Sequence, residues 1–231
     1  MALILHIETA TTVCSVALSQ NGKLVAEKHS IESRAHAQLL TIFIDDLFAD
    51  AGFTFKQLDA VCVSKGPGSY TGLRIGVAVA KGLCYALDKP LIAINTLFSM
   101  TVCMKEQYQQ MSSVEEDTLL FCPLIDARRM EVYTAIYNAQ LQEISKTNAL
   151  IMDNNSFIDF KDKKLIFFGD GAQKLKAVIA PKINAEFIDE FILRANGMVA
   201  EANRRFHTQQ FEDLAYFEPF YLKEFVGNKG A

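Results

Sequence analysis

The hydrophobic and polar positions divide the first part of the chain into short strands. Residues 3–9, LILHIET, form an apolar run that ends in a carboxylate, and residues 13–19, VCSVALS, form a second run. Asn21-Gly22 separates this second run from KLVAEKHS (23–30) and is the strongest short hairpin signal. The pattern predicts a three-stranded β-meander at the start of the chain.

The hydrophobic period then lengthens to that of a helix, which Ser33 can cap and Ala51-Gly52 ends. Its apolar positions share one helical face: Leu39, Leu40, Phe43, Ile44, Leu47 and Phe48.

The next segments alternate between strands and helices. Residues 59–64, DAVCVS, predict a buried strand, and a glycine-rich loop leads from it into a helix from about Gly72 to Leu87. Pro90 opens a short strand, and a helix follows from about Thr96 to Tyr108. The polar stretch 109–117 is the best candidate for a linker.

The strand pattern recurs after this linker at an offset of 118 residues, with Glu8 matching Asp126. Three further pairs support the match: Ile7 with Ile125, Ala17 with Ala135 and Leu18 with Ile136. The repeat predicts an α/β fold with a mixed sheet in each of two lobes, residues 1–108 and 109–231. The second lobe adds a strand and tight turn at 164–172, a helix at 196–207 and an aromatic tail.

Composition narrows the class of protein. Half of the residues are hydrophobic, but no apolar run approaches the roughly 20 residues that span a bilayer. The first residues do not resemble a secretory signal, so we expect a cytoplasmic protein with no membrane contact. The five cysteines include no C-x-x-C pair and predict reduced core thiols. A net charge of −4 argues against binding nucleic acid without help.

The glycine loop has two interpretations. Gly66, Gly68 and Gly72 fit neither the dinucleotide fingerprint nor the P-loop, but backbone N–H groups that open a helix can bind an anion, with Ser69 and Thr71 adding hydroxyls. Alternatively, the glycines only permit a sharp turn and close packing.

The helix after the loop is apolar on nearly every side, which a single sheet cannot cover. Either the preceding helix covers the rest or a partner protein does. Small residues at Gly72, Gly76 and Ala80, and again at Ala78 and Gly82, would let another backbone approach closely.

Other candidate sites are carboxylates and arginines. Glu8 and Asp126 would face one cleft and could hold magnesium or act as acid and base, or each could simply cap a turn. Arg128 and Arg129 follow Asp126 and could bind phosphate or lie in a solvated turn. The four histidines form no H-x-x-x-H or H-E-x-x-H pair, so no metal site is expected.

Several segments together resemble the bacterial TsaB (YeaZ) family: IETATTVCSVAL, SRAHAQLL, GPGSYTGLRIGVAVAKGL, DARRMEVY and GDGA, in this order. The resemblance implies the two-lobed actin-like ATPase (ASKHA, RNase H-like) fold. It also implies a non-catalytic dimerisation subunit for threonylcarbamoyl transfer to adenosine 37 of tRNA. Its partners would be a TsaD-like paralogue and a TsaE-like ATPase, supplied by a TsaC-dependent pathway. The chain would homodimerise when alone and meet tRNA only indirectly.

The resemblance also implies roles for individual residues. The catalytic paralogue carries an H-x-x-x-H metal pair where this chain has Thr96 and Met100, so no catalytic or metal residue is expected. The segment from residue 34 to 48 and the helix 71–85 would meet the partner. The implied interface side chains are Arg34, His36, Leu39, Leu40, Phe43, Thr71, Leu73, Arg74, Ile75, Ala78, Lys81, Gly82 and Tyr85.

No cofactor is expected beyond a nucleotide held within the complex. The candidates for contacting its phosphates are Glu8, Gly66, Gly68, Ser69 and Asp126. The family usually ends its first strand in Asp-Thr, and the longer Glu8 weakens the case for a tight magnesium site. Two alternatives remain open, an ATP-dependent phosphotransferase or ATPase of the same fold and a metalloprotease-like enzyme. Direct tRNA binding is a third, which the acidic balance disfavours.

Overall fold

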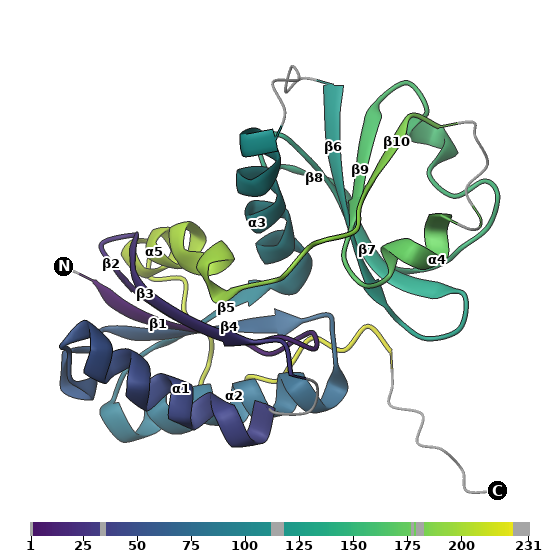
Figure 1. The fold of residues 1–231 in the computed structure, drawn as a ribbon. Helices are drawn as coiled ribbons and strands as arrows, with labels where there is room; N and C mark the ends of the chain where they lie inside the picture. The colour runs from purple at the N-terminus through teal and green to yellow at the C-terminus, as the bar shows by residue number, and fades with distance from the viewer. Residues whose placement is uncertain (1, 33–35, 112–117, 177, 179–182, 224–231) are drawn as a thin grey trace, which may run out of the picture.

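The computed structural model describes residues 2–32, 36–111, 118–176, 178 and 183–223 (Figure 1). The predicted helix cap at Ser33 and most of the predicted linker lie outside these ranges. Five helices accompany the strands within them: α1 (His36–Ala51), α2 (Tyr70–Leu87), α3 (Thr96–Met111), α4 (Ala172–Lys176) and α5 (Val199–His207). Short 3-10 turns are η1 (Phe55–Gln57), η3 (Ile158–Phe160) and η4 (Ala195–Met198).

The strands form two five-stranded mixed sheets, in the orders β3-β2-β1-β4-β5 and β10-β9-β6-β7-β8. The first sheet contains β1 (Leu3–Glu8), β2 (Cys14–Gln20), β3 (Lys23–Ser30), β4 (Ala60–Gly66) and β5 (Leu91–Asn95). The second contains β6 (Leu119–Asp126), β7 (Glu131–Asn138), β8 (Glu143–Ile151), β9 (Lys164–Phe168) and β10 (Ala185–Ile188).

The two sheets share one topology, which confirms the predicted repeat of the meander. In each, the first strand pairs antiparallel with the second and parallel with the fourth. One detail of the repeat is wrong. Ile7 lies opposite Val16 and Ile125 lies opposite Tyr133, so the offset of 118 between the first strands becomes 117 between the second strands. The β6–β7 connection is therefore one residue shorter, and Ala17 and Ala135 are not equivalent.

Both faces of the first sheet are covered. Leu3, Leu5 and Ile7 point to the face that α1 and α2 cover side by side (Figure 1). The alternate residues of β1 point to the opposite face, where Ile4 packs with Met198. Because successive side chains of a strand alternate between faces, His6 and Glu8 also point to this second face.

The chain returns to the first lobe near its end, so the predicted second lobe cannot run continuously from residue 109 to residue 231. Ala195, Met198 and Ala202, from η4 and α5, complete a hydrophobic core on the first sheet. Glu212 then pairs with Leu91 at the edge of that sheet. Apolar burial explains this return, because without it β1, β4 and β5 would expose one hydrophobic face.

Two further predictions concern the state of the cysteines and the presence of membrane-spanning helices. All five cysteines are buried and none forms a disulfide, which confirms the prediction of reduced core thiols. Among the helices in the described ranges, none is long and apolar enough to cross a membrane.

Candidate functional site

The glycine loop between β4 and α2 is filled by the chain's own backbone. A Cβ at Gly68 would lie 2.4 Å from the Ala10 carbonyl oxygen, and a Cβ at Gly72 would lie 2.1 Å from that of Thr9. Only glycine therefore lets the segment after β1 approach this closely. Ser69 donates its N–H to the Ala10 carbonyl at 2.7 Å, and its hydroxyl caps α2 by accepting from the Gly72 N–H at 3.3 Å.

Two of the N–H groups at the predicted phosphate site, those of Gly66 and Ser69, have partners within the chain. The Gly66 N–H donates to the Thr96 hydroxyl at 3.1 Å, as the Ser69 N–H does to Ala10. A Cβ on Gly66 would lie 2.7 Å from the Phe220 carbonyl oxygen, so the C-terminal segment closes the loop from another side. The loop therefore positions α2 against its neighbours, which supports the interpretation in which the glycines permit a sharp turn and close packing.

Glu8 ends β1 as a fully buried carboxylic acid. Its Oε1 accepts hydrogen bonds from the Ala10 N–H at 2.8 Å and the Ser64 hydroxyl at 2.7 Å. Its Oε2 has no hydrogen-bond partner among the described residues. Burial raises the pKa of Glu8 to about 7, and the bonds from Ala10 and Ser64 oppose this only in part.

Asp126, which matches Glu8 in the repeat, has a different environment. Its side chain is 39% exposed, pairs with Lys174 and accepts the Arg128 N–H at 2.6 Å. The Asp126 N–H donates to the Asp170 carboxylate at 2.9 Å. Glu8 and Asp126 have partners in different lobes, and only Asp126 reaches solvent. The structure thus does not bring them together as the predicted pair of carboxylates across one cleft.

The two positions that the resemblance matches to the paralogue's metal pair hold core residues. Thr96 and Met100 are both buried at the start of α3. The Thr96 hydroxyl accepts from Gly66, and the Met100 methyl group lies against Gly169. Within the described ranges no group of three or more histidine, cysteine, aspartate or glutamate residues is arranged to hold a metal ion.

One side of α2 is exposed along the length of the helix. We define the α2 stripe as Thr71, Arg74, Ala78, Gly82 and Tyr85, all of which are exposed. Their spacing of three or four residues places them on one helical side. Tyr85 is 84% exposed, and a Cβ at Gly82 would meet no atom within 4 Å. All five belong to the interface that the resemblance implies.

Other residues of that implied interface are in the protein's own core. Leu40 and Leu73 are each 1% exposed, so neither offers its side chain to a partner. His36 is buried and its Nε2 lies 3.3 Å from the Val13 carbonyl oxygen. The interface roles predicted for Leu40, Leu73 and His36 are wrong. Apolar residues at helical spacing occur both on a face that packs into the core and on a face that meets a partner, so the spacing alone could not distinguish the two. Arg34 lies outside the described residues.

The remaining implied residues are half-buried beside the core. Leu39, Phe43 and Ile75 pack against the first hydrophobic core while keeping part of their surface exposed. Phe43 precedes Asp46 by three residues, and Asp46 pairs with Lys28 of β3. This flank of α1 therefore lies toward β3.

The aromatic tail, residues 211–223, holds the two cations of α2. Lys81 Nζ donates to the carbonyl oxygens of Ala215 at 3.2 Å and Phe217 at 3.0 Å. The Arg74 guanidinium lies 4.1 Å from the centroid of the Tyr70 ring, and its Nε donates to the Tyr221 hydroxyl at 3.2 Å. The tail thus lies along one flank of the α2 stripe.

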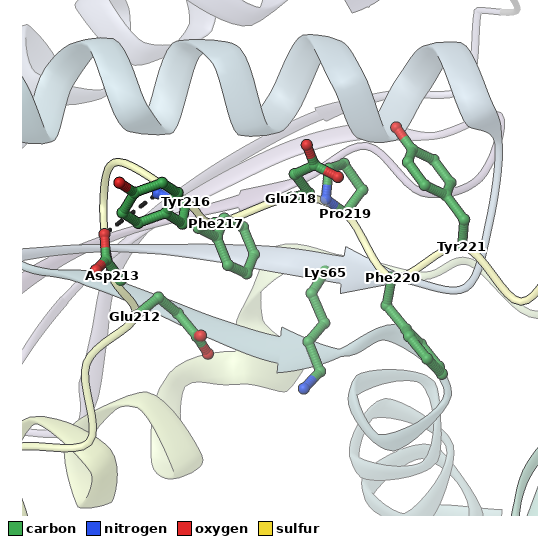
Figure 2. Close-up of a pocket in the computed structure, with 9 residues that line it drawn as sticks. All are labelled: Lys65, Glu212, Asp213, Tyr216, Phe217, Glu218, Pro219, Phe220 and Tyr221. Carbon is green, nitrogen blue, oxygen red and sulfur yellow. Dashed lines mark hydrogen bonds between the residues drawn. The ribbon is translucent and has the colours of Figure 1, made fainter.

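A pocket opens along this tail, lined by Lys65 of β4 and by residues 212–213 and 216–221 (Figure 2). Sequence reasoning did not find it, although the density of aromatic residues in the tail was the available signal. The pattern of the tail has neither helical nor strand periodicity, so its path over α2 depends on tertiary contacts.

Comparison with known proteins agrees with this fold and its motifs. The family model described as "TsaD: tRNA N6-adenosine threonylcarbamoyltransferase" matches residues 29–223. The chain is 28% identical over 217 residues to TsaB of Bacillus subtilis, covering 92% of this chain and 85% of that protein. It is 30% identical over 181 residues to TsaB of Buchnera aphidicola, covering 75% of this chain and 81% of that protein.

The solved structure of YeaZ from Pseudomonas aeruginosa superposes with a TM-score of 0.80 at 24% identity. The match covers 96% of this chain and all of that one. It supports the two-lobed actin-like fold. The family model, the relatives, the motif GPGSYTGLRIG and the repeated sheets together show that this chain belongs to the TsaB (YeaZ) family, which acts in tRNA threonylcarbamoyladenosine biosynthesis.

Proposed function

We propose that this chain is a non-catalytic scaffold subunit for threonylcarbamoyl transfer to adenosine 37 of tRNA. It acts in the cytoplasm by binding a TsaD-like paralogue, which carries the catalytic metal pair, and a TsaE-like ATPase joins the complex. A TsaC-dependent pathway supplies the activated threonylcarbamoyl group. Alone, the chain homodimerises through the surface that it otherwise offers to its partner, and tRNA is recruited indirectly, through the complex.

The observation that carries this proposal is the α2 stripe, and within it Gly82. Glycine in a helix costs roughly 1 kcal/mol relative to alanine, so its presence needs a reason. Gly72 and Gly76 have one, because a Cβ on either would collide with Thr9. Gly82 has open space around it, so nothing in the described part of the fold requires glycine there. Close approach of a partner's backbone supplies the reason.

The residues beside Gly82 fit such a contact. Ala78 precedes it by one turn and is small and exposed, while Tyr85 follows it by three residues and exposes most of its ring. Aromatic anchors beside small residues are common where helices of two proteins pack together, since the ring fills a pocket while the backbones meet. The stripe thus favours a helical partner.

The ATPase alternative receives less support from the site. Glu8 is buried against Ser64, and the N–H groups of Gly66 and Ser69 have partners within the chain. A phosphate group would have to displace these contacts before it could bind to the N–H groups of Gly66 and Ser69. The metalloprotease alternative lacks a ligand set where the paralogue has its histidines, at Thr96 and Met100.

Reconstitution tests the proposal. Purified chain, its TsaD-like paralogue and its TsaE-like ATPase are combined with the threonylcarbamoyl donor and an unmodified tRNA transcript, and modified adenosine is measured by mass spectrometry. We expect modification only when this chain and the paralogue are both present. ATP hydrolysis or peptide cleavage by this chain alone, lost in Glu8→Ala, would contradict the scaffold role and favour an enzyme.

A further inference from the structure

The hairpin that joins β6 to β7 presents two arginines in an unusual backbone conformation. We call residues 127–130 the β6–β7 tip. Arg128 and Arg129 are both exposed, with φ angles of +68° and +53°. Non-glycine residues in this left-handed region are uncommon, and two in succession carry a cost in conformational energy. The surrounding contacts must therefore maintain the turn.

Asp126 and Lys174 supply these contacts. The Asp126 carboxylate accepts the Arg128 N–H at 2.6 Å. Lys174, from α4, pairs with the same carboxylate and also donates to the Arg129 carbonyl oxygen at 2.6 Å. The backbone of the tip is thus fixed by an acid on one strand and a lysine on a helix. The two guanidinium groups are presented on a preorganised turn.

The guanidinium groups of Arg128 and Arg129 form no hydrogen bond or ion pair within the described residues. The other arginines in those ranges all have partners: Arg74 has Tyr221, Arg194 has Glu27, and Arg204 and Arg205 share Glu201. The contrast singles out the β6–β7 tip, because the other arginines that the structure describes are all paired.

Acidic groups near the tip are already engaged. Asp126 pairs with Lys174, Glu131 pairs with Lys223 from the tail, and the Asp170 carboxylate accepts the Asp126 N–H. None of these three carboxylates forms an ion pair with either arginine in the described structure. Two guanidinium groups therefore remain available for an external anion.

We propose that the β6–β7 tip binds phosphate groups of the tRNA backbone, and that this is the chain's own contact with the RNA inside the proposed complex. The inference rests on the proposed function, which brings the chain to a tRNA. Guanidinium is the side-chain group best matched to phosphate oxygens, through paired N–H donors. The chain as a whole, with a net charge of −4, does not favour RNA. The contact adds affinity and orientation without reading sequence.

Salt-dependent tRNA binding tests this inference. Fluorescence anisotropy of a labelled tRNA transcript is measured with the full chain, and with its complex, between about 0.02 and 0.2 M salt. Arg128→Gln/Arg129→Gln removes the two charges, and Lys161→Gln/Lys163→Gln removes two exposed charges elsewhere on the same lobe. The arginine variant should bind roughly tenfold more weakly, with a salt slope reduced by about 1.5, while the lysine variant stays near wild type. Arg128→Lys/Arg129→Lys should keep most of the slope.

Several results would overturn the inference. One is undetectable tRNA binding by both the wild-type chain at low salt and its complex. Another is equal loss in the arginine variant and the lysine control. If the arginine variant binds tRNA normally but no longer forms the complex, the tip binds an acidic protein surface instead. If even the wild-type chain forms no complex with the paralogue, the proposed function fails. The tRNA affinity of the chain alone, compared between wild type and the arginine variant, still tests the role of the tip.

Discussion

The glycines of α2 have two different kinds of surroundings in one helix. Gly72 and Gly76 let Thr9 approach the helix, whereas Gly82 faces open space. The sequence showed small residues at regular spacing and predicted close approach of another backbone. It could not separate approach by the chain's own β1–β2 segment from approach by a partner, because both leave the same pattern.

Gly82→Ala should therefore stabilise the isolated chain. The substitution removes the entropy cost of a helical glycine, worth roughly 0.5–1 kcal/mol, and adds a methyl group that meets nothing within 4 Å. The free energy of unfolding from urea titration checks this. Gly76→Ala is the matched comparison and should destabilise, since its Cβ would lie 2.2 Å from the Thr9 hydroxyl oxygen. A less stable Gly82→Ala chain would mean that the fold itself requires this glycine.

Glu8 makes stability depend on pH with a defined sign. Burial raises the pKa of Glu8 to about 7 from an ordinary value of 4.5, so the folded protein keeps a proton that the unfolded chain releases. Its contribution is full below about pH 4.5 and is lost as the pH rises through about 7, a total of about 3 kcal/mol.

Glu8→Gln, which cannot ionise, should abolish that part of the pH dependence. The measurement is the difference in unfolding free energy between wild type and variant at several pH values from about 4.5 to 8. The variant should gain stability relative to wild type as the pH rises. A constant difference over this range would show that Glu8 does not change its protonation state there.

At the scale of elements, most of the fold could be predicted from the sequence. Period-two runs and Asn21-Gly22 marked the first meander, and both turn residues have positive φ as such a hairpin requires. The side of α2 that stays exposed could not be predicted. Leu73 and Ala78 look alike in an apolar helix, yet Leu73 lies in the core and Ala78 on the surface. Only the position of the sheet distinguishes them.

The contacts of the candidate site could likewise not be predicted from the sequence. The glycine loop gave the correct start of α2 but not the contacts of its N–H groups, because Ala10 and Thr96 reach it from distant segments. Glu8 and Asp126 match in the repeat, yet one is buried and the other pairs with Lys174. Burial and long-range partners depend on the tertiary fold, which local pattern does not encode.

At the level of the whole molecule, the C-terminal tail packs against the core of the N-terminal lobe. Phe217 packs against the core that α1 and α2 share, while the exposed Tyr216 points away from it. Phe217→Ala should therefore reduce the unfolding free energy by about 2 kcal/mol, because the ring is only partly buried. Tyr216→Ala, a change at the adjacent and 85% exposed residue, should have an effect below about 0.5 kcal/mol. Equal effects of the two variants in urea titrations would mean that the tail does not pack on this core.

We propose that the chain works by offering the α2 stripe to a paralogous partner. Ala78→Arg places a long charged side chain in the middle of the stripe, whereas Ala200→Arg makes the same change at an exposed position of α5, which covers the opposite face of the sheet. Gly76, which is buried against Thr9, is unsuitable for this purpose. Both arginine variants should remain folded, because each replaces a surface alanine.

The most direct measurement is the mass of the complex formed with the TsaD-like paralogue, by size-exclusion chromatography with light scattering. Wild type and Ala200→Arg should each elute as a complex of defined stoichiometry. Ala78→Arg should elute unbound, with the circular dichroism spectrum and unfolding midpoint of wild type. If folded Ala78→Arg forms the same complex as wild type, the α2 stripe is not the interface with the paralogue.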